Sequence, residues 1–242
     1  MNTEIFVLSL RQLLGRRRTF ALIALALLPL LVALVFRTGN ADTDPLDWTA
    51  NALLNGLIVT TLLPLVTLVL STTSLGMEIE DGTIVYLLSK PLSRAQVIIA
   101  KLAASWLPAG VLVSLSAASS ASIALDESEA SLIVAFVIAA ALGALAYSSV
   151  FLLLSLLTSR ALVFGLIYVF IWEGIVTGLF SGTRTLSIRE YTLGVADLLT
   201  ETAELDAHLD GVTALVLMAV VTTAFVALAI RRLNRFETRT LF

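Results

Sequence analysis

The chain of 242 residues has no cysteine, one histidine and few charged side chains. The lack of cysteine excludes disulfides, thiolate metal sites and cysteine nucleophiles. The single histidine, His208, has no second histidine at ligand spacing, so we expect no metal site and treat His208 as a solvated residue. The sequence also lacks a G-x-x-x-x-G-K-[ST] phosphate loop and a G-x-S-x-G nucleophile motif, which excludes ATP hydrolysis and acyl transfer by those routes.

What remains is apolar: 58% of the residues are hydrophobic, only 14% are charged, and the mean hydropathy is +0.99. A soluble domain of this composition would expose large apolar patches, whereas a bilayer core needs about 20 apolar residues per helical span. Strand-type alternation is absent, so a β-barrel is not expected. We predict an all-α, polytopic membrane protein with a single transmembrane domain over residues 1–242. The six predicted spans cover about residues 19–36, 52–75, 96–125, 131–158, 161–180 and 212–230.

The distribution of basic residues predicts the orientation of these spans. The first apolar run lacks a small-residue cleavage pattern, so we expect it to be a retained span. Twelve of the 15 basic residues fall on one predicted side of the membrane, which the positive-inside rule assigns to the cytoplasm together with both termini. The opposite connections are acidic, so the net charge of −3 does not indicate a nucleic-acid partner. The twelve are Arg11, Arg16, Arg17, Arg18, Lys90, Arg94, Lys101, Arg160, Arg231, Arg232, Arg235 and Arg239.

A charged passage, SLGMEIEDGTIVYLLSKPLSRAQVIIAKL, separates the second and third predicted spans on this cytoplasmic side. We expect EIEDG to end the second span and TIVYLLS to form a short apolar helix of about two turns that stops at Pro91. Ser93 and Gln96 have the spacing of a capping box, which predicts that a new helix starts there. Such a helix, break, helix elbow suits docking to a cytoplasmic partner. The alternative is an amphipathic segment resting on lipid headgroups.

This passage matches the pattern E-x-x-x-G-T-x-x-x-L-L-S-K-P-x-S-R, and a second motif, YVFIWEG, follows in the fifth span. With these motifs and its six spans, the chain resembles the permease subunits of type-2 ABC exporters, including the branch typified by the permease of the nitrous-oxide-reductase maturation transporter. The resemblance implies that the elbow is a coupling helix that docks on an ATP-binding subunit. The coupling residues that it implies are Glu78, Glu80, Asp81, Gly82, Thr83, Leu87, Leu88, Lys90, Pro91 and Arg94.

The same resemblance implies partners and a location. It implies a cytoplasmic ABC ATP-binding subunit that holds ATP and Mg, a permease homodimer, contacts with membrane lipids, and a prokaryotic plasma membrane. This chain would then carry no cofactor and would not itself be an enzyme. Two alternatives stay open: a permease that serves metalloenzyme or cofactor maturation, and an intramembrane enzyme or scaffold without transport.

Two features near the fifth span are also predicted to matter. Glu173 lies 12 residues after Ala161, roughly 18 Å into a core of about 30 Å, where a lipid-facing carboxylate is costly. We expect Glu173 to bond a neighbouring hydroxyl, to pair with Arg184 or Arg189, or to line the cargo path, unless the span starts deeper and leaves Glu173 near the outer headgroups. The segment 186–199 is predicted to form short helices at the outer face and to gate the exit. Glycines such as Gly143 are expected to permit close helix approach.

Overall fold

The computed structural model is a bundle of helices, and it describes residues 3–13, 16–39, 43–80, 93–125, 129–200 and 208–236. Within these ranges no strand occurs, and six helical segments are long and apolar enough to cross a membrane. The prediction of an all-α chain with six spans is therefore confirmed. The elements are α1 (Thr3–Leu13), α2 (Arg16–Thr38), α3 (Pro45–Asp47), η1 (Trp48–Leu62), α4 (Leu63–Glu80), α6 (Arg94–Ala124), α7 (Ala130–Leu157), α8 (Ala161–Ile167), η3 (Tyr168–Val176), α9 (Thr177–Leu179), η4 (Ser181–Leu186), α10 (Ile188–Leu199) and α11 (Gly211–Phe236).

Two of the spans contain wide helical turns. The second span runs through α3, η1 and α4, and the fifth runs through α8, η3 and α9. The segments η1 and η3 are π-helices, in which each hydrogen bond reaches back five residues. In η1 the hydroxyl groups of Thr60 and Thr61 follow the same spacing and donate to the carbonyl oxygens of Asn55 and Gly56 at 2.8 and 3.2 Å. The sequence did not predict these segments.

The second span begins earlier than predicted, whereas its other end, at Gly76, agrees with the predicted limit near residue 75. It begins at Pro45 and not near residue 52, because Asp44 caps it: Oδ1 of Asp44 accepts a hydrogen bond from the backbone N–H of Leu46 at 3.0 Å. Proline suits the first helical position, where its missing N–H costs nothing. At its other end α4 stays helical to Glu80. The expected break at EIEDG therefore does not fall within the EIE part of that motif.

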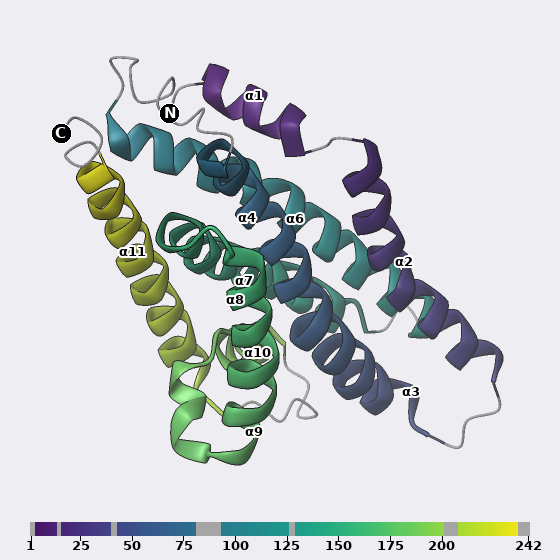
Figure 1. Cartoon of the computed structure of the whole chain (residues 1–242). Coiled ribbons are helices and arrows are strands. Elements are labelled where there is room, and N and C mark those ends of the chain that lie inside the picture. The colour runs from purple at the N-terminus through teal and green to yellow at the C-terminus, as the bar shows by residue number, and fades with distance from the viewer. Residues whose placement is uncertain are drawn as a thin grey trace.

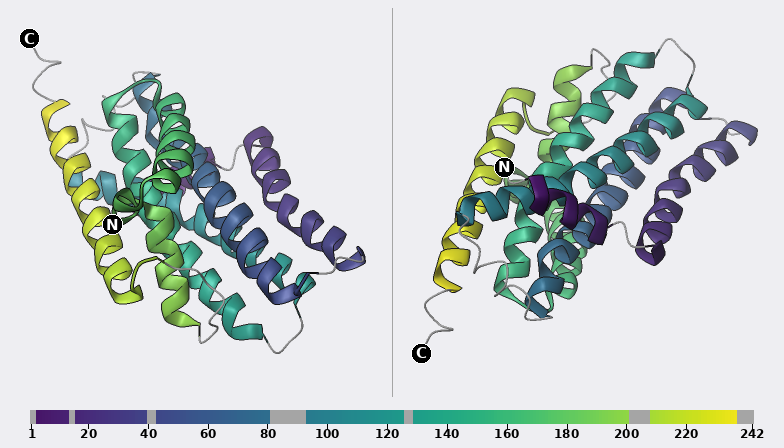
Figure 2. Two further views of the ribbon diagram at one scale, coloured as in Figure 1. Left: turned by 90° about the horizontal axis from the view of Figure 1, so that it is seen from below. Right: turned by 90° about the horizontal axis from the view of Figure 1, so that it is seen from above.

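Helix α7 lies at the centre of the bundle and packs against α4, α6, α8, α10 and α11. Helices α2 and α11 lie at opposite margins (Figure 1). The short amphipathic α1 lies across one end and packs on α6 and α4, with Ser9 and Leu13 buried (Figure 2). We call this end, which holds α1, the last turns of α4 and α11 and the first turn of α6, the terminal end. The other end, which holds α10, is the α10 end.

The central helices approach closely because their contact faces carry small residues. A Cβ added to Gly110 of α6 would lie 3.8 Å from the Cα of Ala141 in α7, so these two backbones are in near contact. The indole N–H of Trp106 donates to the carbonyl oxygen of Ala141 at 2.8 Å, and the Ser114 hydroxyl donates to that of Val137 at 3.0 Å. Small side chains and interhelical hydrogen bonds hold membrane helices together, since lipid provides no hydrophobic drive between them.

Helix α10 is inserted between two spans and does not lie on their surface. A Cβ on Gly143 of α7 would lie 2.5 Å from Oγ1 of Thr192, and a Cβ on Gly194 of α10 would lie 2.6 Å from the Cβ of Ala214 in α11. A Cβ on Gly211 would overlap Leu198. These glycines let α10 pack against α7 on one side and α11 on the other, as the role expected for Gly143 requires. The prediction of a helix within segment 186–199 is confirmed.

The Gly143 contact gives a stability prediction. Replacing Gly143 by Ala should lower the melting temperature of the purified protein in detergent, because the new methyl group would displace Thr192 or α10. Overpacking of this kind costs about 1–3 kcal/mol. Gly76→Ala is the matched control, since Gly76 is also helical and has open space around its Cβ position. Both changes gain the same helix propensity. Equal melting temperatures for the two variants would contradict the close approach.

Candidate functional site

Glu173 lies in η3 with 1% of its surface exposed. Its carboxylate accepts three hydrogen bonds from the same chain. The hydroxyl of Ser187 donates to Oε2 at 2.5 Å, while the hydroxyl of Tyr168 and the backbone N–H of Ile188 donate to Oε1 at 2.8 and 3.0 Å. Glu173 therefore faces the protein interior.

The Glu173 carboxylate sits at the start of α10, which explains how a carboxylate is accommodated there. The first backbone N–H groups of a helix have no partner within the helix and carry the positive end of its dipole. Glu173 satisfies one of these groups, that of Ile188. Hydrogen bonds to a charged group contribute about 1.5–3 kcal/mol each, and leaving either partner buried alone costs a similar amount. The fifth span and α10 thus stabilise each other through this cap.

Ser187 completes the cap from the side of α10. Its Oγ accepts a hydrogen bond from the backbone N–H of Glu190 at 3.3 Å while its hydroxyl proton goes to Glu173. Residues 187–190, SIRE, have the S-x-x-E spacing of a capping box. This signal could have located the start of α10. The Glu173 carboxylate lies 14 residues before Ser187, so the sequence around Ser187 does not indicate that Glu173 takes part in the cap.

Aromatic residues support the cap on two sides. Tyr168, five residues before Glu173 and brought next to it by the π-helical turn, packs edge-on against Phe151 of α7 with ring centroids 6.2 Å apart. Tyr191 of α10 donates its hydroxyl hydrogen to the carbonyl oxygen of Thr185 at 2.5 Å. Burial, and secondarily the Glu173 carboxylate, raise the pKa of Tyr191 above its usual 10.0. The hydroxyl of Tyr191 consequently stays protonated and able to donate at any physiological pH.

The arginines considered as partners for Glu173 bind other groups. Arg184 Nε donates to the carbonyl oxygen of Thr177 at 3.4 Å, and Arg189 Nη2 donates to Oδ1 of Asn55 at 3.1 Å. The second contact ties α10 to η1 and so to the second span. Among the open expectations for Glu173, the structure thus shows hydroxyl and backbone partners in place of an arginine. A role in the cargo path stays a prediction.

His208 lies at the α10 end, where its side chain is 40% exposed and Nδ1 is 3.6 Å from Oε2 of Glu190. In the described part of the chain, no group of three or more His, Cys, Asp or Glu side chains is placed to hold a metal ion. His208 and Glu190 alone provide too few ligands for a structural metal site.

The predicted coupling residues mostly fall outside the described residues. Of the ten, Asp81, Gly82, Thr83, Leu87, Leu88, Lys90 and Pro91 lie there. Glu78 and Glu80 belong to the last turn of α4, and Arg94 is the first residue of α6. Ser93 caps α6, its Oγ accepting a hydrogen bond from the backbone N–H of Gln96 at 3.3 Å, as the capping pattern predicted.

The helices that flank the coupling segment are fastened to each other near its base. The Ser74 hydroxyl of α4 donates to the carbonyl oxygen of Lys101 in α6 at 3.3 Å. Lys101 is 1% exposed and lies about two turns inside α6, within the third span as predicted. The segment 81–92 therefore starts and ends on two packed helices at the terminal end.

The six long apolar helices define a multi-pass α-helical membrane protein. A family model for the ABC-2 family transporter proteins matches residues 10–241, nearly the whole chain. The chain belongs to this family, and it is a permease, the transmembrane component of an ABC transporter. The family is a transport component, not a catalytic one, and it implies an ABC ATP-binding partner. A search of curated proteins gave no match.

The cap predicts different outcomes for two replacements of Glu173. Glu173→Gln keeps an oxygen acceptor for Tyr168 and Ile188, removes the charge, and replaces the oxygen that accepts from Ser187 with an NH2 group. Glu173→Leu strands three buried donors at about 1–3 kcal/mol each. We expect amide exchange over 188–199 to rise strongly in the Leu variant and modestly in the Gln variant. Thr185→Val, a change at an exposed residue beside the cap, is the control. Exchange at the wild-type level in the Leu variant would show that α10 does not depend on Glu173.

Proposed function

We propose that this permease couples to a cytoplasmic ABC ATP-binding subunit through the segment 78–94 and exports its cargo across a prokaryotic plasma membrane. The observation that carries the proposal is the convergence of α4 and α6 at the terminal end, where Ser74 and Lys101 join them. Because the segment connects two helices that pack against each other, a displacement of the segment by a partner would be transmitted to the bundle. Coupling between two sites requires rigid elements that can switch between two discrete arrangements.

The terminal end is proposed to face the cytoplasm. Within the described ranges, α1, the start of α6, the connection between α7 and α8 and the end of α11 are at this end (Figure 1). These regions supply seven basic residues, whereas the α10 end holds three, Arg37, Arg184 and Arg189. The seven are Arg11, Arg94, Lys101, Arg160, Arg231, Arg232 and Arg235. The positive-inside rule favours this orientation. ATP and Mg would then bind the partner at the terminal end, since the sequence has no phosphate loop.

We also propose that two copies of the permease assemble through the fifth span. Gly174 and Gly178 are exposed and four residues apart, and a Cβ at Gly178 would meet nothing within 4 Å. The neighbouring Ile171 and Ile175 are 51% and 55% exposed. Small residues at this spacing let membrane helices approach each other closely. A second fifth span placed there would set two Glu173 caps close to the dimer axis.

The coupling proposal predicts that Gly82→Trp and Glu78→Lys release the ATP-binding subunit. Each change should reduce the ABC ATPase that co-purifies with the tagged permease from native membranes by roughly tenfold or more, the range of an interface hot spot. Quantitative mass spectrometry would identify and count that subunit, and the mass of the intact complex would test for two permeases. Gly182→Trp and Glu129→Lys at the α10 end are the matched controls. Wild-type ATPase recovery with both coupling variants would contradict the proposal.

The orientation is testable because the natural chain has no cysteine. Single replacements Ser93→Cys and Ser159→Cys at the terminal end, and Thr43→Cys and Thr185→Cys at the α10 end, introduce exposed thiols. In intact cells a membrane-impermeant maleimide should label only the second pair, and opening the cells should add the first. Labelling of Ser93→Cys in intact cells would reverse the proposed orientation.

A further inference from the structure

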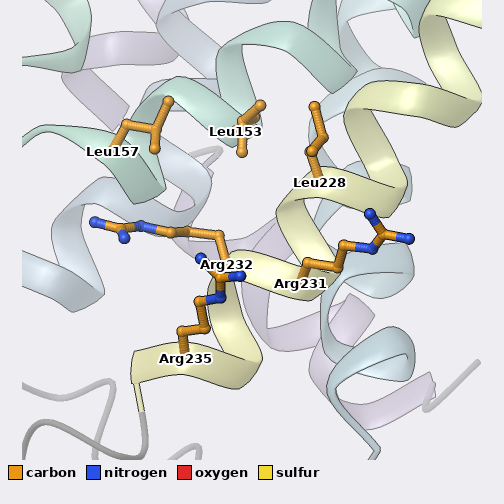
Figure 3. Close-up of a pocket in the computed structure, with 6 residues that line it drawn as sticks. All are labelled: Leu153, Leu157, Leu228, Arg231, Arg232 and Arg235. Atoms are coloured by element: carbon orange, nitrogen blue, oxygen red, sulfur yellow. The ribbon is translucent and has the colours of Figure 1, made fainter.

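A cavity of about 410 Å³ lies between α7 and α11 at the terminal end. Leucine side chains form one wall, and arginine side chains form the other (Figure 3). It is separate from the Glu173 cap. The lining residues are Leu153, Leu157, Leu228, Arg231, Arg232 and Arg235.

The sequence of α11 directs one face into this cavity. Leu228, Arg231, Arg232 and Arg235 occur at positions i, i+3, i+4 and i+7, which share one side of a helix. The leucines of α7 are four residues apart and also share a side. The cavity is therefore amphipathic along α11, apolar at Leu228 and cationic over the next two turns.

The depth of these residues matches the layers of a bilayer. From Gly211, the first residue of α11, to Leu228 is 17 residues, a rise of roughly 25 Å. Arg231 follows at about 30 Å, the thickness of the hydrocarbon core. Helix α7 ends at Leu157, beside the same boundary. With Gly211 at the opposite boundary of the core, the leucines would lie at the depth of acyl chains and the arginines at the depth of lipid phosphates.

Arg232 is fixed in place by the end of α7. Its Nε donates to the carbonyl oxygen of Leu156 at 3.5 Å, and in Figure 3 its guanidinium lies beneath Leu157. The last carbonyl groups of a helix lack partners within the helix and carry the negative end of its dipole, which favours a cation there. This contact anchors the cationic wall next to the leucines. Arg231 and Arg235 are exposed at the rim.

We propose that this cavity is a binding site for an anionic glycerophospholipid. The phosphate and the anionic headgroup would lie among the three arginines, whose planar guanidinium groups suit phosphate oxygens. The upper acyl segments would lie against the leucines. A free phosphate would use only the arginines. The site does not depend on ATP or on cargo, so its test requires the permease alone.

The test measures lipid binding to the delipidated permease in a neutral detergent by native mass spectrometry. Phosphatidylglycerol is compared with phosphatidylcholine of identical acyl chains and with soluble glycerol phosphate. We expect phosphatidylglycerol to be retained preferentially and glycerol phosphate not to displace it. The double change Arg231→Gln with Arg235→Gln should weaken phosphatidylglycerol binding by about 30-fold, because each basic residue near an anionic lipid contributes about fivefold. Arg160→Gln, an exposed arginine at the same end but outside the cavity, should change binding less than about twofold.

Two further variants keep the test decisive if the double Gln variant is poorly folded. Leu157→Trp retains every arginine and fills the apolar wall, so it should also weaken phosphatidylglycerol binding. Arg231→Lys with Arg235→Lys keeps the charge and should bind more tightly than the Gln pair. Equal retention of the two lipids overturns the proposal, as does unchanged binding in the Gln pair and Leu157→Trp. Competition by glycerol phosphate also overturns it, since that result defines a phosphate site and not a lipid site.

Discussion

The Glu173 cap is the contact on which the α10 end of the bundle depends. In hydrocarbon neither a carboxylate nor the free N–H groups at the start of a helix are tolerated alone, because no water is present to satisfy them. In this permease Glu173 and the start of α10 satisfy each other, with Ser187 between them. The chain after the fifth span therefore folds back into the bundle as a helix. Glycines at its contacts with α7 and α11 make the space that it needs.

This arrangement gives α10 four attachments, each to a different span. Glu173 ties it to the fifth span and Arg189 ties it to the second through Asn55, while Gly143 and Gly194 bring it against α7 and α11. If the proposed coupling displaces the fifth span against α7, that movement would have to carry α10 along or break its cap. Helix α10 would then transmit a movement that starts at the coupling segment to the α10 end of the bundle. Packed elements of this kind shift between discrete arrangements and do not deform continuously.

The fold followed from composition, whereas the site required the tertiary structure. Long apolar runs allow only helices in a bilayer, so six spans could be predicted, and the depth of Glu173 marked it as a residue needing partners. The partners of Glu173 could not be predicted. Tyr168 contacts Glu173 through a π-helical turn, which hydropathy does not distinguish from an α-helical one. Ser187 contacts Glu173 because the chain reverses direction after the fifth span. Short features were missed for a related reason: α1 has too few residues to resemble a span. The coupling residues between 81 and 92 rest on the family motif, and their role stays a prediction.

Helix α11 shows how a peripheral span can be held mainly at its two ends. Only 17% of its most apolar 18-residue stretch is buried against the described part of the chain, so its middle is mostly exposed. At the α10 end, α11 packs closely against α10 through Gly211 and Ala214. At the terminal end, Ala229 and Leu233 form a small apolar cluster with Leu152 and Leu156 of α7. Beyond that cluster the helices leave the cavity bordered by arginines. A lipid seated there would fill the gap between α7 and α11 beyond this cluster, and it would add to the attachment of α11 at the terminal end.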